Sequence, residues 1–183
     1  MKISILLPYK ENFSSNYAGA VSLFVKDTVK NSKYKKNTYV YGNTDYKNKL
    51  LNNYVNLNLN KTFYQSGSKL YVESFLKHEQ KKPSNLIEIH NRPNYVKFLK
   101  EGSDAKLTLF FHNDPLSMNG SKTLNERIYL VKNIDQLIFN SSWSKNRFFI
   151  GMKDFYISPS KISIAYQSAS KAKINLKKKQ NII

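Results

Sequence analysis

A short apolar run that ends in a histidine constrains this chain more than any other feature. Residues 106–115 read Lys-Leu-Thr-Leu-Phe-Phe-His-Asn-Asp-Pro. The apolar part, 107–111, consists of strand formers, and such a run is typical of a strand buried on both faces of a parallel sheet. Pro115 then stops it. Because open parallel sheets bind ligands beyond the carboxyl ends of their strands, His112 is a candidate for chemistry; a stray histidine in a surface loop is the alternative.

A second unit of strand and histidine lies upstream. Residues 86–93 read Leu-Ile-Glu-Ile-His-Asn-Arg-Pro, so His90 and Arg92 follow directly on another apolar run. Strands that are consecutive in an α/β chain usually lie close together in the sheet. We therefore expect His90 and His112 at the same edge, on neighbouring or nearly neighbouring strands.

Strands and helices alternate along the chain, which predicts βαβ units and a three-layer α/β fold with a mostly parallel, Rossmann-like sheet. Strands are expected at 3–7, 38–41, 54–59, 86–90, 107–111, 136–140 and 161–166, the third of them as a half-exposed edge strand. Helices are expected at 18–30, 68–81 and 95–100, after a capping box at Thr123 and Glu126, and from 141–143 onward. Gly102 and Gly151 are expected to end two of these helices.

Composition excludes several classes of function. The 183 residues suffice for one domain with a real core, and they include no cysteine. Disulfides, thiol catalysis and cysteine-based zinc sites are thereby excluded. The net charge is +18, but scattered lysines supply nearly all of it. We expect no specific nucleic-acid binding, because phosphate and guanine recognition favours arginine. A weak attraction to an anionic membrane surface fits this charge better.

The start of the chain reads as a buried strand rather than a targeting signal. The apolar part of 1–8 is too short for a signal peptide, no small-residue cleavage site follows, and Lys10 and Glu11 come at once. No apolar stretch is long enough to span a bilayer. We expect a cytoplasmic protein, which its positive charge would allow to sit peripherally at the inner face of the membrane.

Small residues lead into the first predicted helix, where 17–20 read Tyr-Ala-Gly-Ala. Such residues let a ligand approach the free N–H groups of a helix N-terminus, which favour anions and oxygen acceptors. The chain has neither a G-x-G-x-x-G fingerprint nor a phosphate-cradling Gly-Lys-Ser/Thr loop.

Five motifs follow one another in a recognisable order. They are the first strand with its loop 18–20, the strand and histidine at 87–90, the strand at 110–114, the apolar run with Ser-Ser-Trp at 137–143, and the last strand and hinge at 161–168. In this order they resemble the N-terminal half of GT-B glycosyltransferases, in particular the large retaining glycosyltransferase family four. The resemblance spans nearly the whole chain.

This resemblance implies a retaining glycosyltransferase whose glycan or lipid acceptor binds the half present here, with a place in the synthesis of cell-envelope polysaccharide. His112 would be the catalytic residue at the floor of the interdomain cleft, donating a hydrogen bond to a sugar hydroxyl. Asp114 would orient His112 or end the strand in an Asx turn, and the turn is favoured. No metal ion is implied. The acceptor-binding residues would be Ala18, Gly19, His90, Arg92 and Asp114.

The chain departs from the family at three places. The first loop has Ala18-Gly19 where the family often has Gly-Gly, and 167–170 replace a hinge that usually reads Asn-Gly-Val-Asp. The second domain, which binds the sugar nucleotide through a Glu-x₇-Glu motif, has no counterpart, since no two glutamates are eight apart. We therefore expect an acceptor-binding domain at 1–170 and a basic linker with a truncated strand of the donor domain at 171–183. We expect such a half to bind no cofactor and to be inactive alone. A truncated gene, a split enzyme whose partner supplies the donor domain in trans, and a segment cut from a longer protein are the alternatives.

Two other classes of function remain open. A metal-dependent hydrolase would use Glu88, His90, His112 and Asp114, although no H-x-x-x-H or similarly tight spacing is present. A non-catalytic, flavodoxin-like binding domain fits a chain without a second domain.

Overall fold

The computed structural model describes residues 1–59, 66–153 and 155–167. Seven strands in these ranges form one sheet in the order β3-β2-β1-β4-β5-β6-β7, and every neighbouring pair is parallel. The sheet that we expected to be mostly parallel is thus entirely so. The strands are β1 (Ile3–Leu6), β2 (Thr38–Gly42), β3 (Tyr54–Asn56), β4 (Leu86–His90), β5 (Lys106–Phe111), β6 (Gln136–Phe139) and β7 (Ile162–Ile164).

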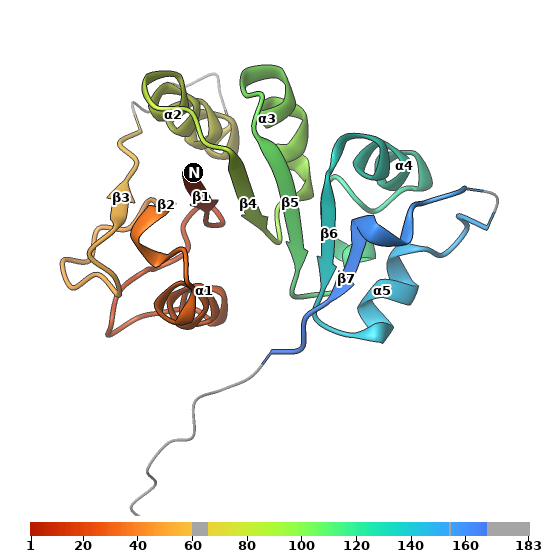
Figure 1. Ribbon diagram of the computed structural model, residues 1–183, viewed down its shortest axis with the longest axis horizontal. Coiled ribbons are helices and arrows are strands. Elements are labelled where there is room, and N and C mark those ends of the chain that lie inside the picture. Colours follow the sequence, from red (N-terminus) through yellow and green to blue (C-terminus); the bar gives the residue numbers. More distant parts are fainter. Residues whose placement is uncertain (60–65, 154, 168–183) are drawn as a thin grey trace, which may run out of the picture.

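Helices cover both faces of the sheet and complete the three layers. The chain builds the sheet outward from β1 to β3, then returns and continues outward through β4 to β7. Because crossovers between parallel strands are right-handed, this reversal places α1 on one face and α2, α3 and α4 on the other (Figure 1). The helices are α1 (Ala20–Asn31), α2 (Gly67–Lys81), α3 (Val96–Gly102), α4 (Leu124–Asn133) and α5 (Ser142–Phe148).

Two apolar cores lie between these layers. The larger one joins α2, α3, α4 and α5 to one face of the sheet, with Phe75, Leu99 and Phe148 fully buried. The smaller one joins α1 to the opposite face through Val21, Val25 and Val29. Its share of the sheet comes from Ile3, Ile5, Leu7 and Val40, so α1 packs over β1 and β2. Side chains on that face of β4 and β5 are more polar, and they include the candidate residues.

Local signals fixed most of the element ends. The capping box of Thr123 and Glu126 opens α4, as expected. Ser141 caps the start of α5. The expectation that Gly151 ends this helix was wrong, because the C-cap is Phe149 and Gly151, with a φ of +79°, lies in the turn two residues further on. The expectation for Gly102 was wrong, because it is the last residue of α3 and Ser103 is the cap. A Cβ at Gly102 would lie 2.6 Å from Leu76 Cδ1, so close packing against α2 accounts for this glycine.

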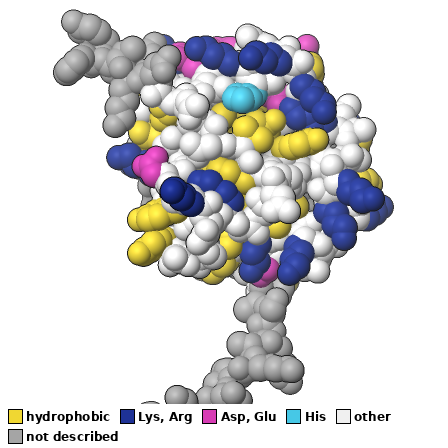
Figure 2. Space-filling view, turned by 90° about the vertical axis from the view of Figure 1, so that its left-hand side faces the viewer, with side chains coloured by type: hydrophobic (Ala, Val, Ile, Leu, Met, Phe, Trp, Pro, Cys, Tyr) yellow, Lys and Arg dark blue, Asp and Glu magenta, His cyan; other side chains and the backbone are white. Residues whose placement is uncertain are grey.

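Lysines are spread over the side of the molecule that carries β3 and α2, without merging into one large basic patch (Figure 2). No helix in the described part of the chain is long and apolar enough to cross a membrane. The expected linker and truncated strand at 171–183 lie outside the described residues.

Candidate functional site

The two histidines meet at the carboxyl edge of the sheet, as the sequence predicted. β4 and β5 are neighbours, with His90 paired in register to Phe110. His112 lies two residues further along, on the same face as His90. The Nδ1 atom of His90 and the Nε2 atom of His112 are 2.8 Å apart, which is hydrogen-bonding distance. His90 is completely buried and His112 is 8 % exposed, so the pair lies just below the protein surface at the carboxyl edge of the sheet.

Charged and amide groups at its two ends fix the direction of this hydrogen bond. Glu88 Oε1 lies 2.8 Å from Nε2 of His90, yet off the direction needed for a hydrogen bond, so the contact is electrostatic. A carboxylate there favours a proton on that nitrogen, which leaves His90 Nδ1 as an acceptor. His112 then donates from Nε2 and accepts at Nδ1. The Gln167 side-chain amide, next to His112 Nδ1, donates to it. In this direction His112 donates to His90 and accepts from Gln167, while the Nε2 atom of His90 faces Glu88 without a hydrogen bond.

His112 is neutral over the physiological range. Burial, and then the neighbouring His90, lower the pKa of His112 from its usual 6.5 to about 3. The ring nitrogen beside Gln167 is therefore a hydrogen-bond acceptor, and a ligand hydroxyl that replaced the glutamine would donate to it. The sequence had led us to expect His112 as the donor to a sugar hydroxyl; the donating nitrogen is instead turned inward to His90.

A pocket of about 300 Å³ opens above this pair. His112 and Arg92 line it, as expected from the sequence. Ala18 and Gly19 do not line it, but the next residue, Ala20, does. His90 lies beneath His112 and outside the lining. The full lining is Pro8, Glu11, Ala20, Val21, Asn91, Arg92, His112, Asn113 and Gln167.

The N-terminus of α1 is already occupied by a carboxylate of the chain itself. Gly19 is the N-cap and has no side chain to offer. Glu11 takes that part: its Oε1 accepts hydrogen bonds from Ser22 N at 3.1 Å and from Ser22 Oγ at 3.0 Å. A Cβ on Gly19 would collide with this carboxylate. The glycine therefore makes room for Glu11 at the helix, where the sequence had led us to expect room for an acceptor.

Asp114 turns away from the histidines. Its Oδ1 accepts from Leu116 N at 3.0 Å in a turn, and its Oδ2 accepts from Arg147 at 2.9 Å. The hydrogen bond from Arg147 lowers the pKa of Asp114. Of the two roles considered, the turn is the one adopted, because the carboxylate bonds to Leu116 N and Arg147.

Three residues of the site escaped sequence reasoning: Glu11, Asn91 and Gln167. Asn91 has a left-handed φ of 51°, and its Oδ1 accepts from the His112 backbone N–H at 2.8 Å. It thereby locks the ends of β4 and β5 together. Asparagine tolerates this conformation well, so its place after a strand and histidine was a usable signal. Glu11 lies 101 residues before His112 in the sequence, and Gln167 lies 55 residues after it. Because only the fold brings them to the pocket, no local pattern could have predicted their place there.

Arg92 lies between two pockets. Its Nη1 donates to Asn91 O at 2.8 Å, and its side chain lines both the His112 pocket and a neighbouring one of about 420 Å³ that also contains Lys122. Nowhere in 1–59, 66–153 or 155–167 do three or more His, Asp or Glu side chains come together so that they could hold a metal ion.

The fold and the placement of this edge define one half of a GT-B glycosyltransferase fold. The chain superposes on a lipopolysaccharide outer core galactosyltransferase, WaaB, with a TM-score of 0.65 and 15 % identity, covering 95 % of this chain and 48 % of that one. It also matches Anabaena HepE, solved with UDP and glucose, with a TM-score of 0.60 and 13 % identity, over 91 % and 44 % of the two chains.

A third match is sucrose-phosphate synthase from Thermosynechococcus elongatus, with a TM-score of 0.54 and 10 % identity, over 91 % and 90 % of the two chains. The chain thus spans about half the length of the first two structures, 48 % and 44 %. No family model matches the sequence, and no curated protein matches it. The similarity is one of fold: a single GT-B half domain.

Proposed function

We propose that this chain is the acceptor-binding half of a retaining GT-B glycosyltransferase. It would hold a glycan or lipid acceptor while a second domain, in the same protein or in trans, presents the sugar nucleotide. The observation that carries the proposal is the pocket over His112, at the carboxyl edge of a GT-B half domain. In a parallel sheet this edge is where ligands bind.

The groups at the pocket suit a hydroxyl-rich acceptor. Neutral His112 offers a hydrogen-bond acceptor at Nδ1, and the buried chain behind it prevents the ring from turning. Arg92 and Asn91 also line the pocket and add guanidinium donors and a side-chain amide. Such a set holds a hydroxyl in one orientation, which is how binding groups lower the barrier of a transfer reaction. The assignment to the retaining class rests on the sequence motifs alone.

The similar structures support this choice of substrate. WaaB is named as a galactosyltransferase of the lipopolysaccharide outer core, and HepE is solved with UDP and glucose. We infer by analogy that the partner domain binds the sugar nucleotide and that this half takes a glycan, free or lipid-linked. A cytoplasmic place at the inner face of the membrane fits these substrates and the charge of +18.

The test is to replace the gene in its source organism by versions that encode His112→Ala and His112→Gln, and to analyse the cell-envelope glycans by mass spectrometry. Both variants should accumulate a glycan that lacks one sugar, with the protein at its normal level by immunoblot. The matched control is His78→Ala, since this third histidine lies on α2, exposed and away from the edge. Unchanged glycans in both His112 variants would refute the proposal.

A further inference from the structure

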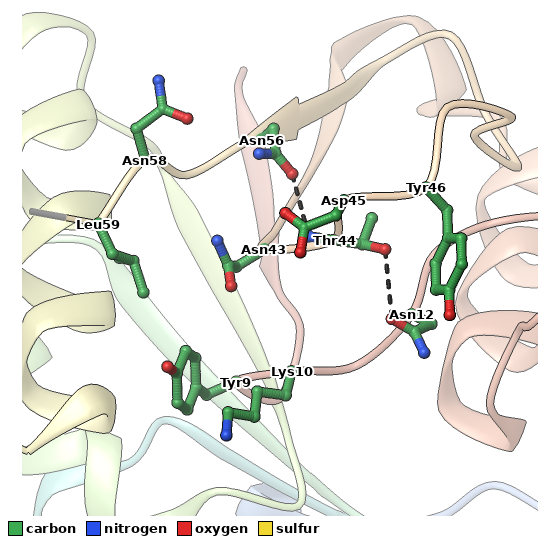
Figure 3. A pocket seen from close by; sticks show the side chains of 10 residues that line it. All are labelled: Tyr9, Lys10, Asn12, Asn43, Thr44, Asp45, Tyr46, Asn56, Asn58 and Leu59. Carbon is green, nitrogen blue, oxygen red and sulfur yellow. Dashed lines mark hydrogen bonds between the residues drawn. The ribbon is translucent and has the colours of Figure 1, made fainter. Parts of the chain in front are cut away.

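A second pocket, of about 690 Å³, lies beside the His112 pocket and has no part in the site above (Figure 3). It is formed where β1, β2 and β3 end. Tyr9 and Lys10 follow β1, Asn43 follows β2, and Asn58 follows β3. The loop Tyr9–Glu11 joins the two pockets, because its first two residues line this one and Glu11 lines the other. The lining is Tyr9, Lys10, Asn12, Asn43, Thr44, Asp45, Tyr46, Asn56, Asn58 and Leu59.

Four asparagine side chains line this pocket, and in three of them a hydrogen bond to the protein fixes one atom of the amide. Asn43 Nδ2 donates to Leu57 O at 2.9 Å, which leaves its Oδ1 unpaired within the described ranges. Asn56 Oδ1 accepts from Thr44 N at 3.0 Å, and Asn12 Oδ1 accepts from the Thr44 hydroxyl at 3.3 Å. Their NH₂ groups have no partner among the described residues. These fixed amides offer one acceptor and two pairs of donors, a set that suits vicinal hydroxyls.

Charge in the pocket favours an uncharged ligand. The chain carries 30 Lys and Arg against 12 Asp and Glu. The lining nevertheless contains one of each sign, Lys10 and Asp45. Lys10 Nζ lies 5.5 Å from the centre of the Tyr9 ring, in a cation–π contact. An anion such as a phosphate would meet no net positive charge in this lining.

One exposed aromatic ring, that of Tyr46, lines the pocket and stacks on a second one outside the lining. Tyr46 is 41 % exposed and Tyr17 is 58 % exposed, and the two rings stack with centroids 4.4 Å apart. The face of an aromatic ring carries partial negative charge, which attracts the C–H groups on the flat face of a pyranose. Lys10 also has a left-handed φ of 66°, an uncommon conformation for lysine that fits a loop shaped for a ligand.

We propose that this asparagine-rich pocket binds an uncharged sugar unit of the acceptor glycan, one or more units away from the reacting hydroxyl. Fixed amides would hold its hydroxyls, and Tyr46 would cover one face of its ring. A volume of 690 Å³ is within the range of small-ligand sites. This inference rests on the proposed function only in calling the ligand an acceptor, since binding of the sugar requires neither a donor nor transfer.

The test is a ¹H–¹⁵N NMR titration of the 183-residue chain with methyl β-glycosides of glucose, galactose, mannose and N-acetylglucosamine, and with methyl glucuronoside and glucose 6-phosphate as anionic probes. At least one neutral glycoside should give saturable shifts at the backbone amides of Asn43, Thr44 and Asn56. Asn43→Ala and Tyr46→Ala should each weaken this binding at least about fivefold. The matched control is Asn119→Ala, in the neighbouring pocket that Lys122 lines, and it should leave the binding unchanged.

No saturable shift with any neutral glycoside, or tighter binding of an anionic probe, would overturn the assignment. An unchanged fold in each variant is read from the rest of the same spectrum. The outcome is separable from that of the gene replacement. Sugar binding with normal glycans in the His112 variants would leave a carbohydrate-binding pocket without the transferase. Altered glycans without sugar binding would remove only the pocket assignment.

Discussion

The contact between Gly19 and Glu11 allows a quantitative test of how the edge of the sheet is built. Glu11 supplies, from a loop, the acceptor that an N-cap side chain would normally supply to α1. Gly19 has ordinary extended angles, φ −74° and ψ 169°, so another residue would fit its backbone. What forbids a larger residue is the carboxylate next to it. Gly19→Ala and Glu11→Ala should therefore be strongly coupled.

The size of this coupling follows from the two hydrogen bonds to Ser22. Loss of a capping acceptor typically lowers stability by about 0.5–2 kcal/mol, so Glu11→Ala should lower the free energy of unfolding by about 1 kcal/mol. Gly19→Ala pushes the carboxylate away and loses the same bonds. In the Glu11→Ala background nothing remains to be displaced. The double-mutant cycle should then show a coupling energy of about 1 kcal/mol.

Urea unfolding of the wild type, both single variants and the double variant measures this coupling. The cycle cancels the intrinsic preference for glycine over alanine at an N-cap. Glu11→Gln is the matched control, because it retains an acceptor oxygen and should lose less stability than Glu11→Ala. Additive effects of the two alanine substitutions, within about 0.3 kcal/mol, would refute the described role of Glu11.

Three further predictions concern the site and its support. Because the pKa of folded His112 is about 3 against 6.5 unfolded, the unfolded chain takes up a proton that the folded chain does not. The free energy of unfolding should therefore fall as the pH drops from about 6.5 toward 3, by up to about 1.4 kcal/mol per pH unit. Urea unfolding of His112→Gln should lack that part of the pH dependence. The same pH dependence in the wild type and the variant would contradict the prediction. Arg147→Ala should raise the pKa of Asp114, read from its carboxyl ¹³C shift, whereas an unmoved titration would show that Arg147 is not the cause. Tyr71→Phe removes a buried hydroxyl that donates to Leu7 O at 2.9 Å. It should lower the free energy of unfolding, measured in urea, by about 1–2 kcal/mol, whereas the control Tyr39→Phe should have no effect. An unchanged free energy of unfolding in Tyr71→Phe would mean that this hydrogen bond does not stabilise the fold.

The sequence was most informative where a local pattern determines the outcome. Apolar runs stopped by polar residues predicted β4 and β5, and the rule that consecutive strands lie close predicted the contact of His90 with His112. The capping box predicted the start of α4. These features depend on residues within a few positions of one another.

What the sequence could not provide depends on contacts between distant parts of the chain. The neutral state of His112 follows from its burial and from His90, and its tautomer follows from Glu88 and Gln167; these groups meet only in the assembled sheet. Glu11 reaches the start of α1 across a loop, so Gly19 alone suggested open space. The asparagine-rich pocket gathers residues from three strand ends, and asparagine is too common in this chain for any one of them to stand out.

Arg92 provides the most direct test of the claim that this half binds the acceptor. Glycosyl transfer would be measured in membranes of the source organism, for the wild type and Arg92→Gln, with acceptor and sugar nucleotide varied in turn. Loss of a charge-assisted hydrogen bond of about 1.4 kcal/mol should raise the half-saturating acceptor concentration about tenfold. The value for the sugar nucleotide should not change. A rise for the sugar nucleotide instead, or no change in either, would contradict the account.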